Sequence, residues 1–459
     1  MRFGDTLLLA VAMALVAYAA CYWLLMRRSP DPAMGITLVL LPYWTLAGAI
    51  PVLLAKRQEP TKDYSYLEGR LFPIFIDNTY ALTLLVYIVF LGASLALIAV
   101  FTRPESGARR RWGVERWRAL SVRFSHPLLL AGTGMLLIVK LAIVIYLVRT
   151  SGSASLYEAT RVVRGGQAGI LRVYQYLNFV VAYPLAAGFA LWLCFPMSRA
   201  LSRRPARYAM WGLYVSMLLT LLAENALLGN RAVPLVMMAG VASGWLRWRY
   251  LPATRASRRP LQRRFLVTAF LGLLVIGTIG ISRGGSLDSP SAVVGSLSSN
   301  VVRVGNVAIQ STRSAEKLAA HMSLYGVLDQ EANVQLHPLA SNSYAVYTKL
   351  VDAPPDQVFT VHYVTAWWLR LGPLGLVPAV LTFALAVATI QRIATRATSV
   401  WSAGFSLAAA TLPAAGIPIT ILRSGPESLR AVFVELLLLP GIVLIPCFVL
   451  GSKRIRTID

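Results

Sequence analysis

The stretch YAMWGLYVSMLLTLLAENALL, residues 208–228, is followed after the turn GNRA by VPLVMMAGVASGWLRWR, residues 233–249. A helix needs roughly 20 consecutive apolar residues to cross the hydrocarbon core of a bilayer. Two apolar runs of about that length, joined by a short turn, predict two neighbouring membrane-crossing helices. One basic side chain, Arg231, lies in the turn between them, where a charge needs a physical reason.

The composition of the whole chain agrees with a bilayer as its solvent. Of its 459 residues, 57% are hydrophobic and 14% are charged, and the mean hydropathy is +0.62. Soluble domains average roughly 25% charged residues. All three cysteines, Cys21, Cys194 and Cys447, lie in apolar runs. They therefore indicate neither a disulfide framework nor a metal site.

Further apolar runs predict an all-α polytopic membrane protein with about eleven transmembrane helices, the first of them too long for a signal peptide. The predicted spans are 6–26, 34–55, 80–101, 127–148, 178–197, 208–228, 233–249, 265–282, 372–391, 401–421 and 431–451. No internal repeat is visible at a fixed period.

The basic residues decide the orientation of these spans. The net charge of +25 could indicate nucleic-acid binding. However, many of the arginines of the chain lie in loops that fall on the same side of the membrane if successive spans alternate in direction. These loops are FTRPESGARRRWGVERWR, SRALSRRPAR, RWRYLPATRASRRPLQRR and the tail KRIRTID. Cytoplasmic loops carry such an excess of Lys and Arg. We therefore expect a cytoplasmic C-terminus, an N-terminus on the outer side and no nucleic-acid partner.

The outer side carries the longer loops, 149–177 and 283–371, within a single transmembrane domain, 1–459. The larger loop has turn signals such as RGGSLDSPS and is expected to contain short helices, one of them around residues 301–322.

Arginines on the outer side run against the orientation bias. The outer arginines are Arg161, Arg164, Arg231, Arg283, Arg303, Arg313, Arg423 and Arg430. Guanidinium groups bind phosphate in a planar, bidentate geometry, and neighbouring glycines let backbone N–H groups approach as well. The cluster is therefore suited to a diphosphate whose lipid tail remains in the bilayer. Each arginine alone is equally compatible with snorkelling to lipid headgroups.

Several motifs occur in the order found in a known family. LLGNRAVPLVMMAG follows RVVRGGQAG, and the large outer loop is followed by YVTAWWLRLGPLGLVPAVL and then ILRSGPESLRAVF. Over roughly residues 140–450 this order resembles the Wzy-type oligosaccharide repeat-unit polymerases, which make O-antigen. The last turn differs from the family in the position of its acid, Glu427.

The resemblance implies a glycosyltransferase of the bacterial inner membrane with its active site facing the periplasm. Its substrates would be undecaprenyl-diphosphate-linked oligosaccharides, and a polysaccharide chain-length regulator would be a partner besides the membrane lipids. Such a donor already carries its leaving group, so no cofactor is expected. The chain shows no phosphate-binding loop, no dinucleotide fingerprint and no outer D-x-D motif.

The predicted diphosphate-binding residues are Arg161, Arg164, Arg231, Arg283, Arg423 and Arg430. We expect Arg231, Arg283 and Arg423 to stabilise the charge that develops on the leaving group. Candidates for the general base are Glu427, His362, His337 and Asp356. Glu427 could instead form a local ion pair with Arg423 and Arg430, and His362 could be a structural histidine.

Aromatic residues and intramembrane charges complete the list of candidates. Tyr344, Tyr347 and Tyr363 are predicted to stack on sugar rings, with Tyr325, Trp367 and Trp368 as further aromatic candidates, although an interfacial belt would use the same residues. Lys140 lies near the middle of a span and needs a partner, for which Glu224 and Glu435 are the intramembrane acids. A structural ion pair is the expected role, and proton movement is the alternative.

Of two other functions, a ligase remains open, whereas charges that collect at one face argue against transport. An O-antigen ligase, which transfers the lipid-linked glycan to lipid A core, would share the donor and the arginines. A lipid-linked oligosaccharide flippase would instead line a central cavity with charges and show internal repeats.

Overall fold

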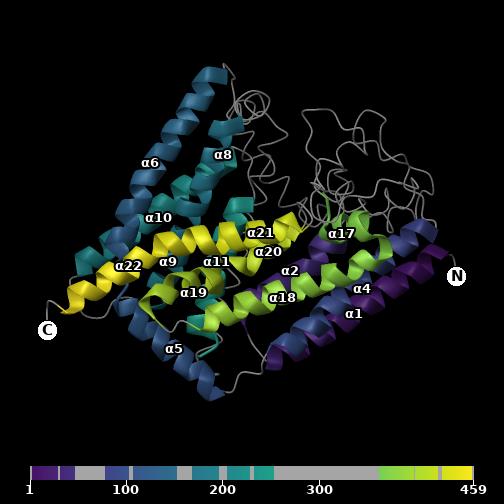
Figure 1. Ribbon diagram of the computed structural model, residues 1–459. Helices are drawn as coiled ribbons and strands as arrows, with labels where there is room; N and C mark the ends of the chain where they lie inside the picture. Colours follow the sequence, from purple (N-terminus) through teal and green to yellow (C-terminus); the bar gives the residue numbers. More distant parts are fainter. Residues whose placement is uncertain are drawn as a thin grey trace, which may run out of the picture.

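The computed structural model describes residues 3–28, 31–46, 78–102, 107–151, 168–195, 204–227, 232–252, 361–396, 399–421 and 426–456. Every regular element in these ranges is a helix (Figure 1). The first part of the chain forms α1 (Phe3–Arg28), α2 (Pro32–Leu46), α4 (Asn78–Phe101), α5 (Gly107–Val122), α6 (His126–Ser151) and α8 (Ala168–Leu177). The central part forms the π-helix η1 (Asn178–Ala182), α9 (Tyr183–Cys194), α10 (Arg204–Leu227), α11 (Ala232–Trp245) and the π-helix η2 (Leu246–Tyr250).

Every regular element described in the C-terminal part is also a helix. This part forms α17 (Tyr363–Leu371), the 3₁₀-helix η4 (Gly372–Gly375), α18 (Leu376–Thr395), α19 (Val400–Thr411), α20 (Pro413–Ile421), α21 (Glu427–Phe433), the π-helix η5 (Val434–Leu438) and α22 (Leu439–Arg456).

Seven of the described helical segments are long and apolar enough to cross a membrane, or eight if the bent pair α19–α20 is one span. The seven segments are Leu9–Arg28, Leu82–Phe101, His126–Thr150, Arg172–Cys194, Pro205–Asn225, Tyr363–Thr395 and Glu427–Ser452. They coincide with seven of the predicted spans and confirm a helical protein of multi-pass membrane character.

The remaining predicted spans have different outcomes. Residues 34–46 of the predicted 34–55 span lie in α2, and residues 47–55 lie outside the described residues. The 233–249 span corresponds to α11 and η2. The 265–282 span lies outside the described residues. The total of eleven spans therefore stays a prediction.

Parts of both predicted outer loops are helical. The helix α8 occupies residues 168–177 of the expected 149–177 loop, and α17 occupies residues 363–371 of the expected 283–371 loop. Both segments contain polar residues, which is why the sequence predicted loops there. In the structure, α8 continues directly into η1 and α9, and α17 continues into η4 and α18. Residues 283–360, with the helix expected around 301–322, lie outside the described residues.

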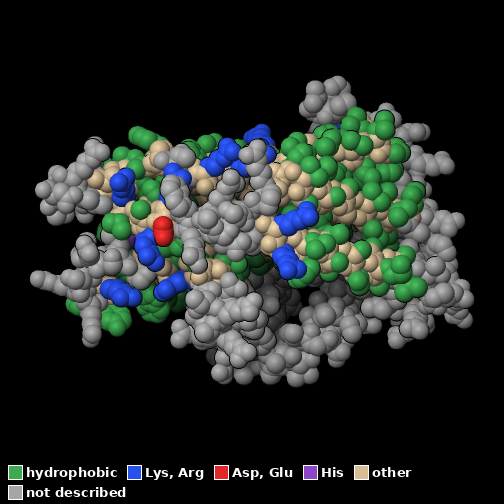
Figure 2. Space-filling view, turned by 90° about the horizontal axis from the view of Figure 1, so that it is seen from below, with side chains coloured by type: hydrophobic (Ala, Val, Ile, Leu, Met, Phe, Trp, Pro, Cys, Tyr) green, Lys and Arg blue, Asp and Glu red, His purple; other side chains and the backbone are tan. Residues whose placement is uncertain are grey.

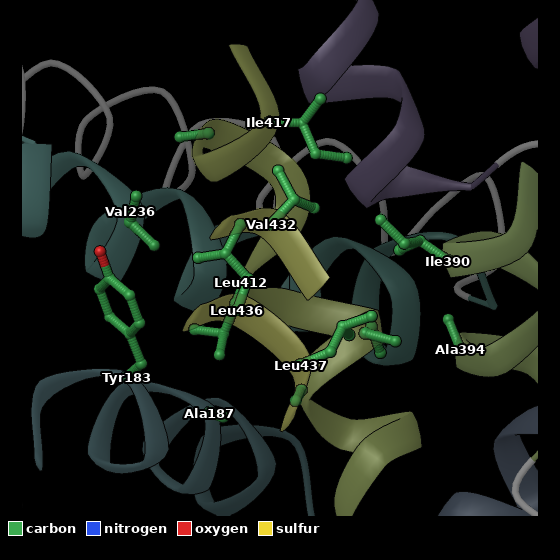
Figure 3. Close-up of a cluster of buried hydrophobic side chains, with 14 of the residues drawn as sticks. Tyr183, Ala187, Val236, Ile390, Ala394, Leu412, Ile417, Val432, Leu436 and Leu437 are labelled. Atoms are coloured by element: carbon green, nitrogen blue, oxygen red, sulfur yellow. The ribbon is translucent and has the colours of Figure 1, made fainter. Parts of the chain in front are cut away.

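Small residues allow the central helices to approach closely. A Cβ atom on Gly404 of α19 would lie 2.8 Å from the carbonyl oxygen of Gly441 and 2.9 Å from the backbone nitrogen of Ile445, both in α22. Close backbone contact of this kind is common between membrane helices, where packing rather than apolar burial drives association. The buried apolar cluster in Figure 3 joins α9, α11, α18 and the segment from α20 to η5.

The bent pair α19–α20 turns by 60° at a break next to Pro413, which has no backbone N–H to donate. Two hydroxyl groups from other helices contact the carbonyl groups around this break. Ser243 of α11 donates to the carbonyl oxygen of Ala410 at 2.9 Å, and the Thr37 hydroxyl of α2 lies 3.1 Å from that of Pro413. The break is therefore packed into the core with polar partners.

Arginines gather at one end of the molecule, which we call the basic end. The described arginines of this end are Arg27, Arg28, Arg116, Arg118, Arg123, Arg207, Arg247, Arg249, Arg392 and Arg396. Figure 2 shows that Lys and Arg side chains outnumber Asp and Glu side chains among the described residues on this side. The arginine-rich segments of the sequence were expected to lie on one side of the protein, and their described arginines do so.

Contacts between helix ends define the basic end. Arg247 of η2 forms an ion pair with Asp31, and the rings of Trp117 and Trp248 lie 5.1 Å apart. The backbone N–H of Ser125, just before α6, donates to the carbonyl oxygen of Cys447 in α22 at 2.8 Å. The helices α6 and α10 start at this end, whereas α4, α18 and α22 finish there. The starts of α4, α17 and α21 lie away from the basic end, and so do the C-terminal ends of α6 and α10 (Figure 1). We call this side of the molecule the opposite end.

Candidate functional site

Most of the predicted site residues lie outside the described residues. These residues are Arg161, Arg164, Arg231, Arg283, Arg423, Tyr344 and Tyr347, together with the base candidates His337 and Asp356. The structure places His362, Tyr363, Glu427 and Arg430, and all four belong to the opposite end of the molecule, in or beside α17 and α21.

An ion pair between α17 and α21 is the central feature of this region. Arg370 donates from Nη2 to Oε1 of Glu427 at 2.6 Å and from Nη1 to the carbonyl oxygen of Ala366 at 2.9 Å. The side chain of Arg370 is 3% exposed, whereas that of Glu427 is 38% exposed. One partner is thus enclosed by protein and the other faces outward.

The local sequence explains why these two charges stand at helix ends. Gly372 ends α17 with a φ of 58°, a backbone conformation that favours glycine, so Arg370 falls in the last turn of that helix. Glu427 is the first residue of α21. A cation near a helix C-terminus and an anion near a helix N-terminus both complement the helix dipole.

Arg430 lies in the last turn of the same short helix α21 and is exposed. The helix places Glu427 and Arg430 one turn apart. The ion pair that the structure shows for Glu427 is with Arg370, a residue 57 positions earlier in the chain. The sequence interpretation did not single out Arg370, although an arginine two residues before a glycine in an aromatic, apolar segment was a usable signal.

His362 caps α17. Its Nδ1 accepts a hydrogen bond from the backbone N–H of Val364 at 3.2 Å, and its side chain is fully buried. The ring of Tyr87 lies 4.6 Å from the imidazole ring and the ring of Phe90 lies 6.3 Å from it, measured between centroids. These contacts are typical of a structural histidine, which is one of the two roles that the sequence left open for His362. A role as general base would require the start of α17 to move.

Tyr363 is also buried. Its hydroxyl group lies 2.5 Å from the hydroxyl group of Thr382 in α18, and its ring packs beside those of Phe90 and Trp367. In this conformation the ring has no open face on which a sugar could stack. Trp367 and Trp368 are only partly buried and are the more accessible aromatic residues of α17.

A second polar cluster lies between α6, α8 and α10. Lys140 donates from Nζ to Oε2 of Glu224 at 2.6 Å, and the Tyr174 hydroxyl donates to Oε1 of the same carboxylate at 2.6 Å. The ammonium group also lies 4.9 Å from the centroid of the Tyr174 ring. The side chains of Lys140 and Glu224 are 0% and 3% exposed. The expected intramembrane ion pair is confirmed, and Glu224 is its acid.

Within the described part of the chain, no group of three or more His, Cys, Asp and Glu side chains could hold a metal ion. The charged side chains of α17 and α21 offer anion binding and proton transfer. Arg370 and Arg430 can bind an anion, and the partly exposed carboxylate of Glu427 can accept a proton.

The chain matches no family model, no curated protein and no solved structure.

Proposed function

We propose that this protein polymerises undecaprenyl-diphosphate-linked oligosaccharide repeat units at the periplasmic face of the bacterial inner membrane. The proposal includes the eleven-span topology, with a cytoplasmic C-terminus and the opposite end of the molecule facing the periplasm. The observation that carries it is the Arg370–Glu427 ion pair beside Arg430, at the end of a multi-pass protein away from its basic end.

The proposed reaction uses these residues in defined roles. The terminal sugar hydroxyl of one lipid-linked glycan attacks the anomeric carbon of the other, and the carbon–oxygen bond to the diphosphate breaks. Glu427 accepts the proton of the attacking hydroxyl, and undecaprenyl diphosphate leaves with the bonding electrons. Arg370 and Arg430 stabilise the negative charge of the leaving group together with Arg231, Arg283 and Arg423, as fixed cationic donors do in other reactions with charged leaving groups.

A genetic experiment tests this proposal. In a strain deleted for the gene, wild-type protein is expected to restore the ladder of surface polysaccharide on a gel, whereas Arg231→Ala, Arg423→Ala and Arg430→Ala are expected to reduce it. Arg396→Ala is the matched control, because this exposed arginine lies at the basic end. A full ladder from all three variants at normal protein levels would contradict the assignment.

The same gels distinguish the alternatives. Lipid A core capped by a single repeat unit in the deletion strain indicates a polymerase. Loss of all capping, with polymer stored on the lipid carrier, indicates a ligase.

A transporter is the second candidate, and two observations favour it. The pair α19–α20 is a broken helix, and Lys140 and Glu224 form a buried ion pair within the helical bundle. Broken helices and intramembrane charges are both common in secondary transporters, where they form binding sites. Flipping of labelled lipid-linked glycan by purified protein in vesicles, without growth of the glycan, would establish transport instead.

A further inference from the structure

The Arg370–Glu427 pair is asymmetric. The guanidinium group is enclosed by protein and fixed by the carbonyl oxygen of Ala366, whereas the carboxylate lies at the surface. A buried cation keeps its charge at a high free-energy cost unless an anion stays beside it. Glu427 meets that requirement, but its exposure means that it can move away into water without an equal desolvation cost.

Arg430 adds a second positive charge near Glu427, which favours the binding of a larger anion there. It extends from the same helix α21, one turn after Glu427, and is exposed. An anion that replaced the Glu427 carboxylate beside Arg370 would therefore lie next to the helix that carries a second, exposed arginine. A diphosphate carries more negative charge than a carboxylate and has oxygens on two phosphorus atoms, so one molecule can bind both arginines.

We infer that Glu427 occupies the anion site of Arg370 in the empty protein and that the diphosphate group of a lipid-linked substrate displaces it. This inference rests on the proposed function and adds a regulatory step to it. No covalent bond changes in the exchange, since one ion pair replaces another.

The exchange predicts a specific effect of removing the competing charge. Purified full-length protein in detergent is titrated with inorganic pyrophosphate while its thermal unfolding midpoint is recorded. Glu427→Gln is expected to unfold at a lower temperature than wild type without pyrophosphate. It is expected to bind pyrophosphate about tenfold more tightly, which corresponds to about 1.4 kcal/mol.

Matched variants give the controls. Glu115→Gln removes an exposed acid at the basic end and should bind pyrophosphate as wild type does. The double variant Arg370→Gln/Glu427→Gln should lose the gain in affinity. Glu427→Asp keeps the charge on a shorter side chain and should bind with an intermediate affinity, which keeps the test decisive if Glu427→Gln does not fold.

Two outcomes would overturn the exchange: equal pyrophosphate affinity in Glu427→Gln, Glu427→Asp and wild type, or an unchanged gain in the double variant. Its failure is distinguishable from failure of the proposed function. Wild-type protein that builds a polysaccharide ladder but shows no dependence of pyrophosphate affinity on residue 427 would refute only the exchange. If the variants show the predicted pyrophosphate affinities but deletion of the gene leaves the polysaccharide ladder intact, only the proposed polymerase function is refuted.

Discussion

The buried Lys140–Glu224 pair gives the sharpest test of what holds the α6, α8 and α10 helices together. Lys140→Met leaves a carboxylate without its cation in a site where the lysine is fully buried. Breaking one side of a buried ion pair costs about 3–5 kcal/mol, because the remaining charge has lost its compensation. The neighbouring Tyr174 hydroxyl continues to donate to the carboxylate, so we expect the lower limit, about 3 kcal/mol, from the same range.

The double variant shows whether the Lys140 and Glu224 side chains stabilise the protein as a pair. Lys140→Met/Glu224→Gln removes both charges, while the glutamine oxygen still accepts the hydrogen bond from Tyr174. Replacement of both partners by uncharged groups of similar size is often close to neutral. The double variant is therefore expected to be more stable than either single variant, with a coupling free energy of at least about 2 kcal/mol.

Unfolding is measured by titrating SDS into detergent micelles and following tryptophan fluorescence. Arg149→Met is the control, because Arg149 is an exposed cation in the last turn of the same helix α6. The reasoning is wrong if the two single effects simply add to within about 0.5 kcal/mol, since independent sites add in that way. A stable single variant would also mean that the pair is not the principal link between these helices.

Two further predictions concern neighbouring contacts. Tyr174→Phe is expected to destabilise the protein by about 1.5–3 kcal/mol, because it removes a hydrogen bond to a buried charge, and Tyr176→Phe on the exposed face of α8 should have little effect in the same unfolding assay. Gly404→Val is expected to lower the unfolding midpoint strongly, because a Cβ atom would lie 2.8 Å from the backbone oxygen of Gly441. Gly212→Val is its control, since no neighbouring atom lies within 4 Å of a Cβ there, and equal midpoints for the two variants would show that α19 and α22 can separate without cost.

The sequence by itself determined the class of the protein. Apolar runs of bilayer length predict helices wherever they occur, because a backbone in hydrocarbon must satisfy its own hydrogen bonds. The arginine-rich segments likewise predicted a basic end, since charged loops stay on one side of a membrane. The sequence also indicated that Lys140 needs a partner, because an unpaired charge in a membrane span is costly.

Only the tertiary structure decided which groups meet. The choice of Glu224 for Lys140 depends on how α6 and α10 pack, and spacing within one helix contains no information on that packing. The pairing of Arg370 with Glu427 is non-local in the same way, and so is the burial of His362 among the rings of Tyr87 and Phe90. Periodicity reports what lies along one helix, whereas the contacts of a site are made across helices that are distant in the chain.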